Sequence, residues 1–176
     1  RTSAALAALL LVGLLAPALG AQERWPISLY RDALRLEEKK DYPKAIEAYK
    51  KVVKGMGGRP VTIRTFDLGG DKFFPDQKHV CELNPQLGLR AIRFCLKERE
   101  LFKIQLRAIL RVSTQGKIRV MFPMISGIEE IQEAKRIFFQ VRDELLAKGE
   151  SVGRDIEIGV MIEVPSAVIV AEELAK

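Results

Sequence analysis

Residues that bind transition metals are scarce in this sequence. Its 176 residues include two cysteines, Cys81 and Cys95, which lie 14 positions apart, and one histidine, His79. A zinc site needs about four sulfur or imidazole ligands, often with two of them in a Cys-x-x-Cys pair, so we expect no zinc site here. We expect both cysteines to be free thiols and His79 to be solvated in a polar loop.

A strong excess of charge of one sign is also missing from most of the chain. The formal net charge is +6, but residues 1–55 hold 10 basic and 6 acidic residues, whereas residues 56–176 hold 19 and 17. Nucleic-acid-binding surfaces are typically basic stripes interleaved with aromatic side chains, and this sequence has no such stripe. We therefore expect no nucleic-acid partner.

The chain is too short for one common enzyme fold. Its 176 residues, of which 48% are hydrophobic, are enough to build one domain with a buried core. A complete eight-stranded α/β barrel needs roughly 250 residues. Any barrel pattern in this sequence must therefore come from part of such a barrel.

Residues 1–22 have the pattern of a secretory signal peptide. Arg1 precedes an apolar run at 4–15, and the small residues Ala18 and Gly20 stand before a cleavage site at Ala21. The alternative is a buried helix. An apolar run of about a dozen residues is too short to cross a hydrocarbon core of roughly 30 Å. The pattern favours export over a membrane anchor.

Residues 23–55 predict a helical hairpin. Apolar residues recur at helical spacing on both sides of a break at 41–43, and residues 41–49 resemble the junction of a tetratricopeptide repeat. About three such repeats are needed for a stable stack, and only one copy is present. Two interpretations stay open: a binding repeat, or an amphipathic hairpin packed against the domain that follows.

From residue 56 onward, strand-like and helix-like segments alternate, which is typical of parallel α/β structure. We predict strands at 61–67, 117–124 and 156–164 and helices at 84–112, from 128 to about 145, and at 166–176. Asn84 is a candidate helix N-cap, and Ser126 to Glu129 has the form of a capping box. The fold class is thus α/β, an incomplete (β/α)8 TIM-type barrel with about three of eight strands, preceded by an N-terminal helical segment. The expected domains are 1–22, 23–55 and 56–176.

Two charged side chains are expected on the inner face of the barrel sheet. Side chains alternate between faces along a strand, and the aliphatic residues of the first and third strands suit the helix-covered face. Arg64 and Glu163 then project from the opposite face, near the carboxyl ends where α/β barrels place their chemistry. A charge in an interior is costly unless it is paired or liganded. A structural ion pair is one explanation; a phosphate for Arg64 and a divalent metal for Glu163 is the other.

Five segments of the chain have a distinctive pattern. They are 64–72 (RTFDLGGDK), 84–93 (NPQLGLRAIR), 105–111 (QLRAILR), 121–125 (MFPMI) and 157–165 (EIGVMIEVP). Together they resemble the phosphoenolpyruvate-binding domain of the phosphoenolpyruvate–protein phosphotransferase family, enzyme I of the sugar phosphotransferase system, over about residues 48–176. Pyruvate phosphate dikinase is a more distant relative, and the Gly-Gly-Asp-Lys loop favours the phosphotransferase.

The resemblance implies transfer of the phosphoryl group of phosphoenolpyruvate to a protein histidine. It implies that Arg64 binds the phosphate, that Arg90 is a further arginine of the pocket, and that Glu163 is one of two carboxylates that hold Mg²⁺. It also implies a histidine-containing phosphocarrier protein as partner, a homodimer, and a cytoplasmic location. The signal-like pattern at 1–22 conflicts with that location.

Several functional features of the family are not found in this sequence. The first-strand arginine motif is replaced, and the second metal-binding carboxylate, a later pocket arginine and the cysteine that protonates the enolate would lie beyond Lys176. We therefore expect the isolated chain to be a fragment without catalytic activity. The alternative is an exported helical-repeat interaction protein, or a chimeric reading frame, without catalytic function.

Overall fold

A computed structural model describes residue 32, residues 42–67, residue 84 and residues 87–176. The predicted signal peptide at 1–22, nearly all of the first helix of the predicted hairpin, the Gly-Gly-Asp-Lys loop, His79 and Cys81 lie outside the described residues. Of the helices that are described, none has both the length and the apolar character needed to cross a membrane.

Three parallel strands form the centre of the structure. They are β1 (Val61–Arg64), β2 (Ile118–Phe122) and β3 (Glu157–Val160), and they pair in that order. Each strand pairs with the next one along the chain, as parallel strands joined by helical crossovers do. The expected α/β class is confirmed. The described residues form an open three-stranded sheet rather than a closed barrel.

Every strand ends earlier than the sequence predicts. One backbone hydrogen bond follows the last residue pair on each side of β2. Beside β1, Thr65 N–H donates to the Met121 carbonyl at 3.0 Å, and beside β3, Met161 N–H donates to the Phe122 carbonyl at 2.9 Å. Pairing of β2 then stops at Pro123, because proline has no N–H to donate. The predicted strand ends at 67, 124 and 164 are therefore wrong, and these positions belong to loops at the carboxyl edge of the sheet.

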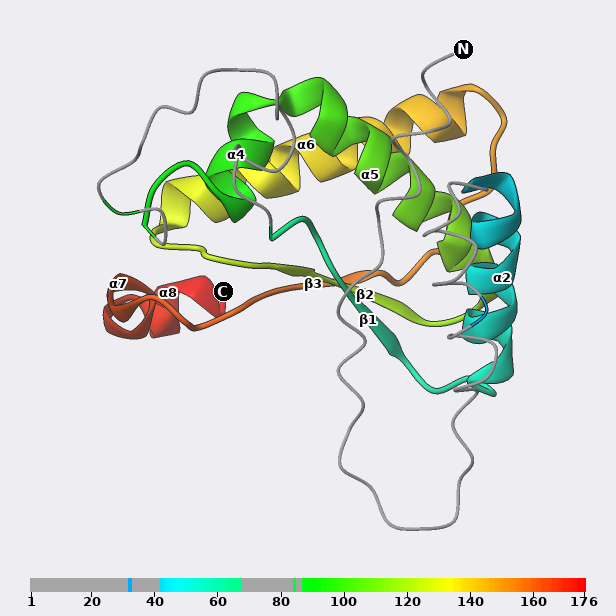
Figure 1. Cartoon of the computed structure of the whole chain (residues 1–176), viewed down its shortest axis with the longest axis horizontal. Coiled ribbons are helices and arrows are strands. Elements are labelled where there is room, and N and C mark those ends of the chain that lie inside the picture. Colours follow the sequence, from blue (N-terminus) through cyan, green and yellow to red (C-terminus); the bar gives the residue numbers. More distant parts are fainter. Residues whose placement is uncertain (1–31, 33–41, 68–83, 85–86) are drawn as a thin grey trace, which may run out of the picture.

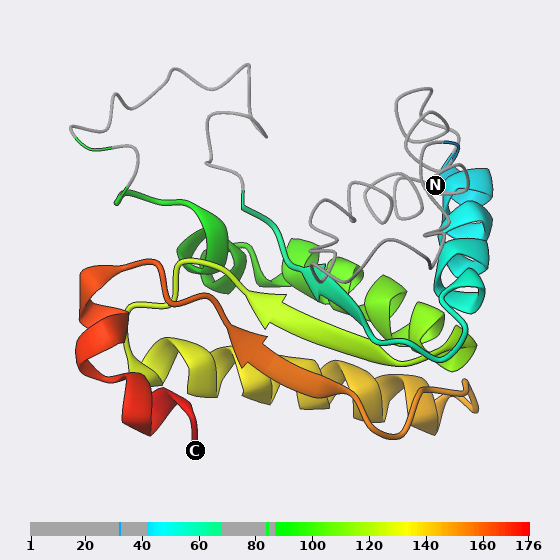
Figure 2. The same ribbon diagram turned by 90° about the horizontal axis from the view of Figure 1, so that it is seen from below.

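Three helices lie over one face of this sheet, as Figures 1 and 2 show: α4 (Ala91–Lys97), α5 (Arg99–Val112) and α6 (Ile128–Ala147). The strand residues facing them are aliphatic or aromatic, and those of β1 and β2 are fully buried. Of the positions on the expected helix from 128 to about 145 that the apolar spacing predicts to face inward, those at 131, 138, 141 and 145 are buried, whereas Ile128 at the first position of α6 is only partly buried. Burial also includes Ala134 and Ile137. The buried side chains that form the core with the helices include Val61, Ile63, Ile118, Val120, Phe122, Phe102, Leu106 and Phe138.

The alternation of side chains along the strands agrees with the prediction. In β1, Ile63 is buried against the helices, whereas Arg64 lies on the opposite face and is half-buried. In β3, Ile158 packs against the core and Glu157 is exposed. The expectation fails for Ile162, which is 48% exposed because β3 has already ended at Val160.

The long helix expected at 84–112 is divided into two helices that begin later. Ala91, the first residue of α4, has φ +50°, a left-handed value through which a right-handed helix cannot continue. Residues before it therefore cannot share its helix. Asn84 caps a single turn instead, where its Oδ1 accepts a hydrogen bond from Leu87 N–H at 3.3 Å. A second break falls at Glu98, between α4 and α5.

Two further helix expectations need correction. The capping box predicted from Ser126 to Glu129 does not form, because α6 begins one residue later, with Gly127 as its N-cap. The third helical residue is then Glu130, whose carboxylate accepts hydrogen bonds from Ser126 N–H at 2.6 Å and Ser126 Oγ at 2.9 Å. The last expected helix is likewise divided at Val170 into α7 (Pro165–Ile169) and α8 (Ala171–Leu174).

Helix α2 (Tyr42–Gly55), the second helix of the predicted hairpin, packs against the α/β part of the chain. Its side chains Tyr49 and Val53 are buried in the same core as the strands, together with Met56 just after the helix. Figure 1 shows α2 beside the end of the sheet at which β1 begins. For this helix, the structure supports the packed hairpin over a free binding repeat.

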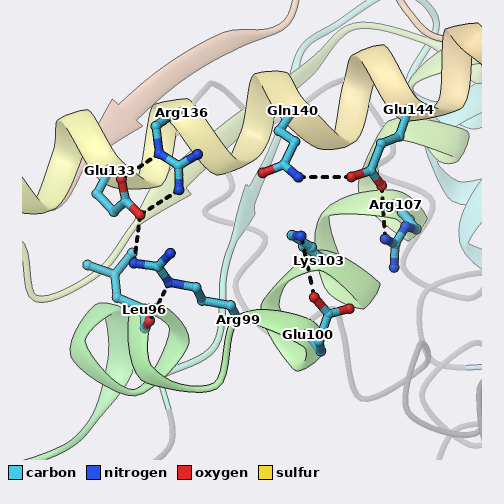
Figure 3. Close-up of polar contacts among 9 residues, drawn as sticks. All are labelled: Leu96, Arg99, Glu100, Lys103, Arg107, Glu133, Arg136, Gln140 and Glu144. Atoms are coloured by element: carbon cyan, nitrogen blue, oxygen red, sulfur yellow. Dashed lines mark hydrogen bonds and ion pairs between the residues drawn. The ribbon is translucent and has the colours of Figure 1, made fainter.

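Ion pairs join α5 to α6 along the outer side of the helical layer (Figure 3). Arg99 and Arg107 of α5 bind Glu133 and Glu144 of α6, at 2.9 and 3.0 Å. Gln140 also donates a hydrogen bond to Glu144 at 3.1 Å. Basic residues eight positions apart lie on roughly the same side of a helix. The spacing of Arg99 and Arg107 on α5 therefore explains why both can pair with α6.

Candidate functional site

The charged residues predicted to be functional gather at the carboxyl edge of the sheet. The strands are parallel, so their carboxyl ends share one edge, which is where α/β enzymes place their binding groups. Arg64 is the last residue of β1, Arg90 is the N-cap of α4, and Glu163 follows β3. The loops that follow the strands therefore carry all three predicted side chains.

Two arginines converge on one carboxylate at this edge. Arg64 Nη1 lies 3.0 Å from Asp67 Oδ2, and Arg90 Nη2 lies 3.0 Å from Asp67 Oδ1. All three side chains are between 21% and 25% exposed, so the pairs are partly shielded from water and remain accessible to a small anion. The group carries two positive charges and one negative charge, an arrangement that favours a further anion.

Local backbone structure holds each arginine in place. Arg64 is fixed by β1, which pairs with β2 in a register that places it opposite Met121. Arg90 has an extended backbone, with φ −142° and ψ 169°, and its N–H donates to the Gly88 carbonyl at 2.9 Å. Its own carbonyl accepts hydrogen bonds from the first turn of α4. One guanidinium therefore comes from a strand end and the other from a helix start.

Asp67 is a functional candidate that the sequence analysis missed. It lies three residues after Arg64 in the segment at 64–72, and its carboxylate is the group that joins the two predicted arginines. The signal that could have found it is its place directly after a strand, beside an interior-facing cation that needs a partner. The first of the two explanations for Arg64 is confirmed, since it forms an ion pair, with Asp67 as its partner. Phosphate binding by Arg64 stays a prediction.

Glu163 joins two loops at the same edge. Its exposed side chain accepts a hydrogen bond through Oε1 from Met124 N–H at 2.7 Å, so the loop after β3 is tied to the loop after β2. Met124 has φ +59°, a left-handed backbone value that is uncommon outside glycine, and this bond satisfies its N–H. One carboxylate oxygen is thus engaged in holding the loops.

The described residues do not provide a complete metal site. No group of three or more histidine, cysteine, aspartate or glutamate side chains in the described part of the chain is arranged to hold a cation. The Asp67 oxygens bind arginines, which leaves Glu163 as the predicted metal ligand at this edge. A magnesium ion needs about six oxygen ligands, some from water and substrate, so one carboxylate does not fit a tight site.

These features define an α/β protein in which two arginines and an aspartate meet at the carboxyl edge of a parallel sheet. Residues 26–176 match the family described as "PEP-utilising enzyme, PEP-binding domain", and the chain belongs to that family. The sequence-based recognition is confirmed. The match begins before residue 48, in the segment predicted to form the helical hairpin, and the predicted domain boundaries remain predictions.

Three bacterial relatives of this chain share the name phosphoenolpyruvate-protein phosphotransferase. The chain is 45% identical over 146 residues to a phosphoenolpyruvate-protein phosphotransferase of Bacillus subtilis strain 168, which is 83% of the chain and 25% of the relative. The chain is 44% identical over 148 residues to the protein of the same name from Latilactobacillus sakei, which is 84% of the chain and 25% of the relative. It is 43% identical over 153 residues to that of Listeria monocytogenes serovar 1/2a, which is 85% of the chain and 27% of the relative. The chain therefore spans about a quarter of the length of these relatives.

Proposed function

We propose that this chain is the phosphoenolpyruvate-recognition part of a phosphotransferase, and that Arg64 and Arg90 bind the phosphate of phosphoenolpyruvate. The observation that carries the proposal is the convergence of both guanidinium groups on the Asp67 carboxylate, at 3.0 Å each. A phosphate offers oxygens to two guanidinium groups in the same manner, and planar guanidinium groups bind it in two-pronged fashion. Asp67 therefore holds the arginines close together despite their mutual repulsion.

The proposed reaction places these arginines beside the group that is transferred. The bond between phosphorus and the enol oxygen breaks, a bond between phosphorus and a histidine nitrogen of the acceptor protein forms, and the remaining enolate takes up a proton to become pyruvate. Fixed positive charges stabilise the equatorial phosphoryl oxygens in such a transfer. Arg64 and Arg90 would bind and orient the phosphate and neutralise part of its charge.

The metal and the fold extend this proposal. Glu163 would supply one oxygen ligand to Mg²⁺, which neutralises phosphate charge when it is bound, but the described residues do not complete the site. We expect phosphoenolpyruvate binding without turnover from the chain by itself.

The three strands would be consecutive strands of a TIM-type barrel with Arg64 on its inner face. A histidine-containing phosphocarrier, a homodimer and a cytoplasmic location complete the proposal by family resemblance.

The alternative of a helical-repeat interaction protein is not supported by the residues that are described. A binding repeat needs an apolar face available to a partner, whereas Tyr49, Val52 and Val53 of α2 are between 1% and 4% exposed. Tyr49 and Val53 belong to the same core as the strands. The domain core thus uses the face that a repeat would present.

Replacement of the two arginines tests the proposal. We expect Arg64→Ala and Arg90→Ala each to weaken phosphoenolpyruvate binding by more than about tenfold in isothermal titration calorimetry, because each removes a charge-assisted hydrogen-bonding group. Arg119→Ala is the matched control. Arg119 lies on the same face of the sheet and is paired with Glu157 at 3.0 Å, so its loss changes the net charge equally without touching the proposed site. Equal weakening by all three variants would reduce the effect to net charge and reject the assignment.

A further inference from the structure

Gln105 is a buried polar side chain for which the proposed phosphate site has no stated role. It lies in α5 and is 1% exposed, among fully buried apolar neighbours such as Phe102 and Leu106. Its Oε1 accepts a hydrogen bond from Phe66 N–H at 3.1 Å, and its Nε2 has no hydrogen-bond partner in the described part of the chain. Burying an amide with an unused donor costs free energy, and the hydrogen bond from Phe66 N–H satisfies only the acceptor end of this side chain.

The hydrogen bond falls at the point where β1 leaves the sheet. Thr65 N–H still donates to Met121 of β2 at 3.0 Å, and the next N–H, that of Phe66, donates to Gln105 of α5 instead. Consecutive N–H groups of an extended chain point to opposite sides, so Phe66 N–H points away from β2. The backbone at 65–66 is therefore hydrogen-bonded to β2 on one side, through Thr65, and to Gln105 of α5 on the other, through Phe66.

Arg64 and Asp67, the residues on either side of 65–66, belong to the proposed phosphate site. Arg64 precedes Phe66 by two positions, and Asp67 follows it directly. The Phe66 N–H that Gln105 binds lies in the peptide unit directly before the one that leads to Asp67, and Asp67 in turn binds Arg64 and Arg90 at 3.0 Å. An error of about 1 Å in such a group is enough to impair binding of a transferring phosphoryl group.

We infer that Gln105 is a positioning residue for the phosphate site, which it supports from a helix without touching the ligand. This inference rests on the proposed function. The hydrogen bond from Phe66 fixes the loop after β1, the loop fixes Asp67, and Asp67 aligns the two arginines. The buried amide is explained by this role, because an apolar side chain of equal size would leave Phe66 N–H unfixed.

Three variants of the full chain test the inference. Gln105→Met keeps the length of the side chain and removes the acceptor, whereas Gln105→Glu keeps an oxygen at the same place. Ser113→Ala is the matched control, because Ser113 is also buried and its Oγ accepts a hydrogen bond from Gly153 N–H at 2.8 Å, in a part of the chain that does not border the site. The readouts are the NMR signals of the Arg64 and Arg90 Nε–H groups, with and without phosphoenolpyruvate, and the dissociation constant.

We expect Gln105→Met to shift both arginine signals without ligand and to weaken phosphoenolpyruvate binding by about tenfold. Gln105→Glu should restore affinity to within about threefold, and Ser113→Ala should leave signals and affinity unchanged despite a comparable loss of thermal stability. Should Gln105→Met fail to fold, hydrogen exchange in the wild type decides the question. Phosphoenolpyruvate should then slow exchange at Phe66 N–H more than at Gly153 N–H.

The inference is overturned if Gln105→Met leaves the ligand-free arginine signals unmoved, if it and Ser113→Ala weaken binding equally, or if ligand slows both amides alike. The proposed function fails on a different result, namely wild-type arginine signals that do not respond to phosphoenolpyruvate. In that event the positioning role is judged by the ligand-free arginine signals, which Gln105→Met must still shift.

Discussion

Single residues at the carboxyl edge of the sheet combine structural contacts with proposed binding roles. Glu163 accepts a hydrogen bond from Met124 N–H at 2.7 Å, and it is also the proposed ligand of Mg²⁺. Asp67 likewise neutralises part of the charge of Arg64 and Arg90 and sets their separation. A substitution at either position can therefore act through structure or through the ligand, and only matched pairs of substitutions separate the two.

Two substitutions at Glu163 make this separation. Glu163→Gln keeps an oxygen that can accept the Met124 hydrogen bond and loses the negative charge, whereas Glu163→Ala loses both. We expect both variants to lose the Mg²⁺ dependence of phosphoenolpyruvate binding in calorimetry. Only Glu163→Ala should also lower the melting temperature, because it removes the hydrogen bond that ties the loop after β3 to the loop after β2. Unchanged Mg²⁺ dependence in Glu163→Gln would remove Glu163 from the metal site.

Cys95 shows what burial does to a reactive group away from the site. It lies in α4, is 1% exposed and is free, as the sequence predicts. Burial raises the pKa of its thiol from 9.0 to about 12, because the thiolate would lose its hydration. The thiolate is the form that reacts with alkylating agents.

We therefore expect iodoacetamide at about pH 8 to leave Cys95 unmodified in the native protein and to modify it fully in concentrated guanidinium chloride. Peptide mass spectrometry reads the modification at this cysteine separately from Cys81. Rapid native modification of Cys95 would show that this side chain is accessible to solvent in the folded protein.

At the scale of elements, α5 serves two purposes on two of its sides. One side bonds to the loop after β1 through Gln105, and another carries the cations that pair with α6. The pKa of Glu144 is lowered, first by its hydrogen bond from Arg107, and that of Glu150 is lowered by its hydrogen bond from Arg111. The helix layer is thus fastened by ion pairs on the outside and by apolar packing underneath.

These pairs predict a dependence of stability on pH. A carboxylate whose pKa is lowered in the folded state stabilises the protein fully above its unfolded pKa, near 4.5, and this contribution is lost as the pH falls through the folded-state pKa. We expect Glu144→Gln to lower the melting temperature by about 2 °C near neutral pH, and we expect this difference to shrink as the pH falls below about 4.5.

The control is the same substitution in an Arg107→Ala background, where the pH-dependent difference should disappear. A difference that persists at low pH in calorimetric melting curves would assign the effect of Glu144 to packing rather than to charge.

At the scale of the whole molecule, segments that are distant in the sequence share one core. Tyr49 of α2, Val120 of β2 and Leu145 of α6 are all buried in it, and helices cover one face of a sheet whose strands follow in sequence order. Figure 2 shows the loops at the carboxyl ends of the strands on the same side of the molecule. The proposed site therefore depends on the sheet register, and a shift of one strand by a residue would move Arg64 to the helix face.

Periodicity in the sequence was enough to predict the α/β class, the three strands and the faces on which Ile63 and Ile158 lie. These features depend on alternation and hydrophobicity, which are local properties. The ends of strands and helices were predicted less well. They depend on partners far away in the sequence, such as Gln105 for Phe66, or on a backbone angle such as that of Ala91.

The sequence by itself determined which side chains are available for the proposed phosphate site, because Arg64 and Arg90 stand in the recognisable segments 64–72 and 84–93. Only the tertiary structure decided that both arginines meet at Asp67 and that Phe66 N–H donates a hydrogen bond to Gln105. The physical reason is the separation along the sequence over which each kind of interaction acts. Alternation along a strand acts over neighbouring residues, whereas hydrogen bonds and ion pairs between residues 23 or 39 positions apart exist only after the helices have packed on the sheet.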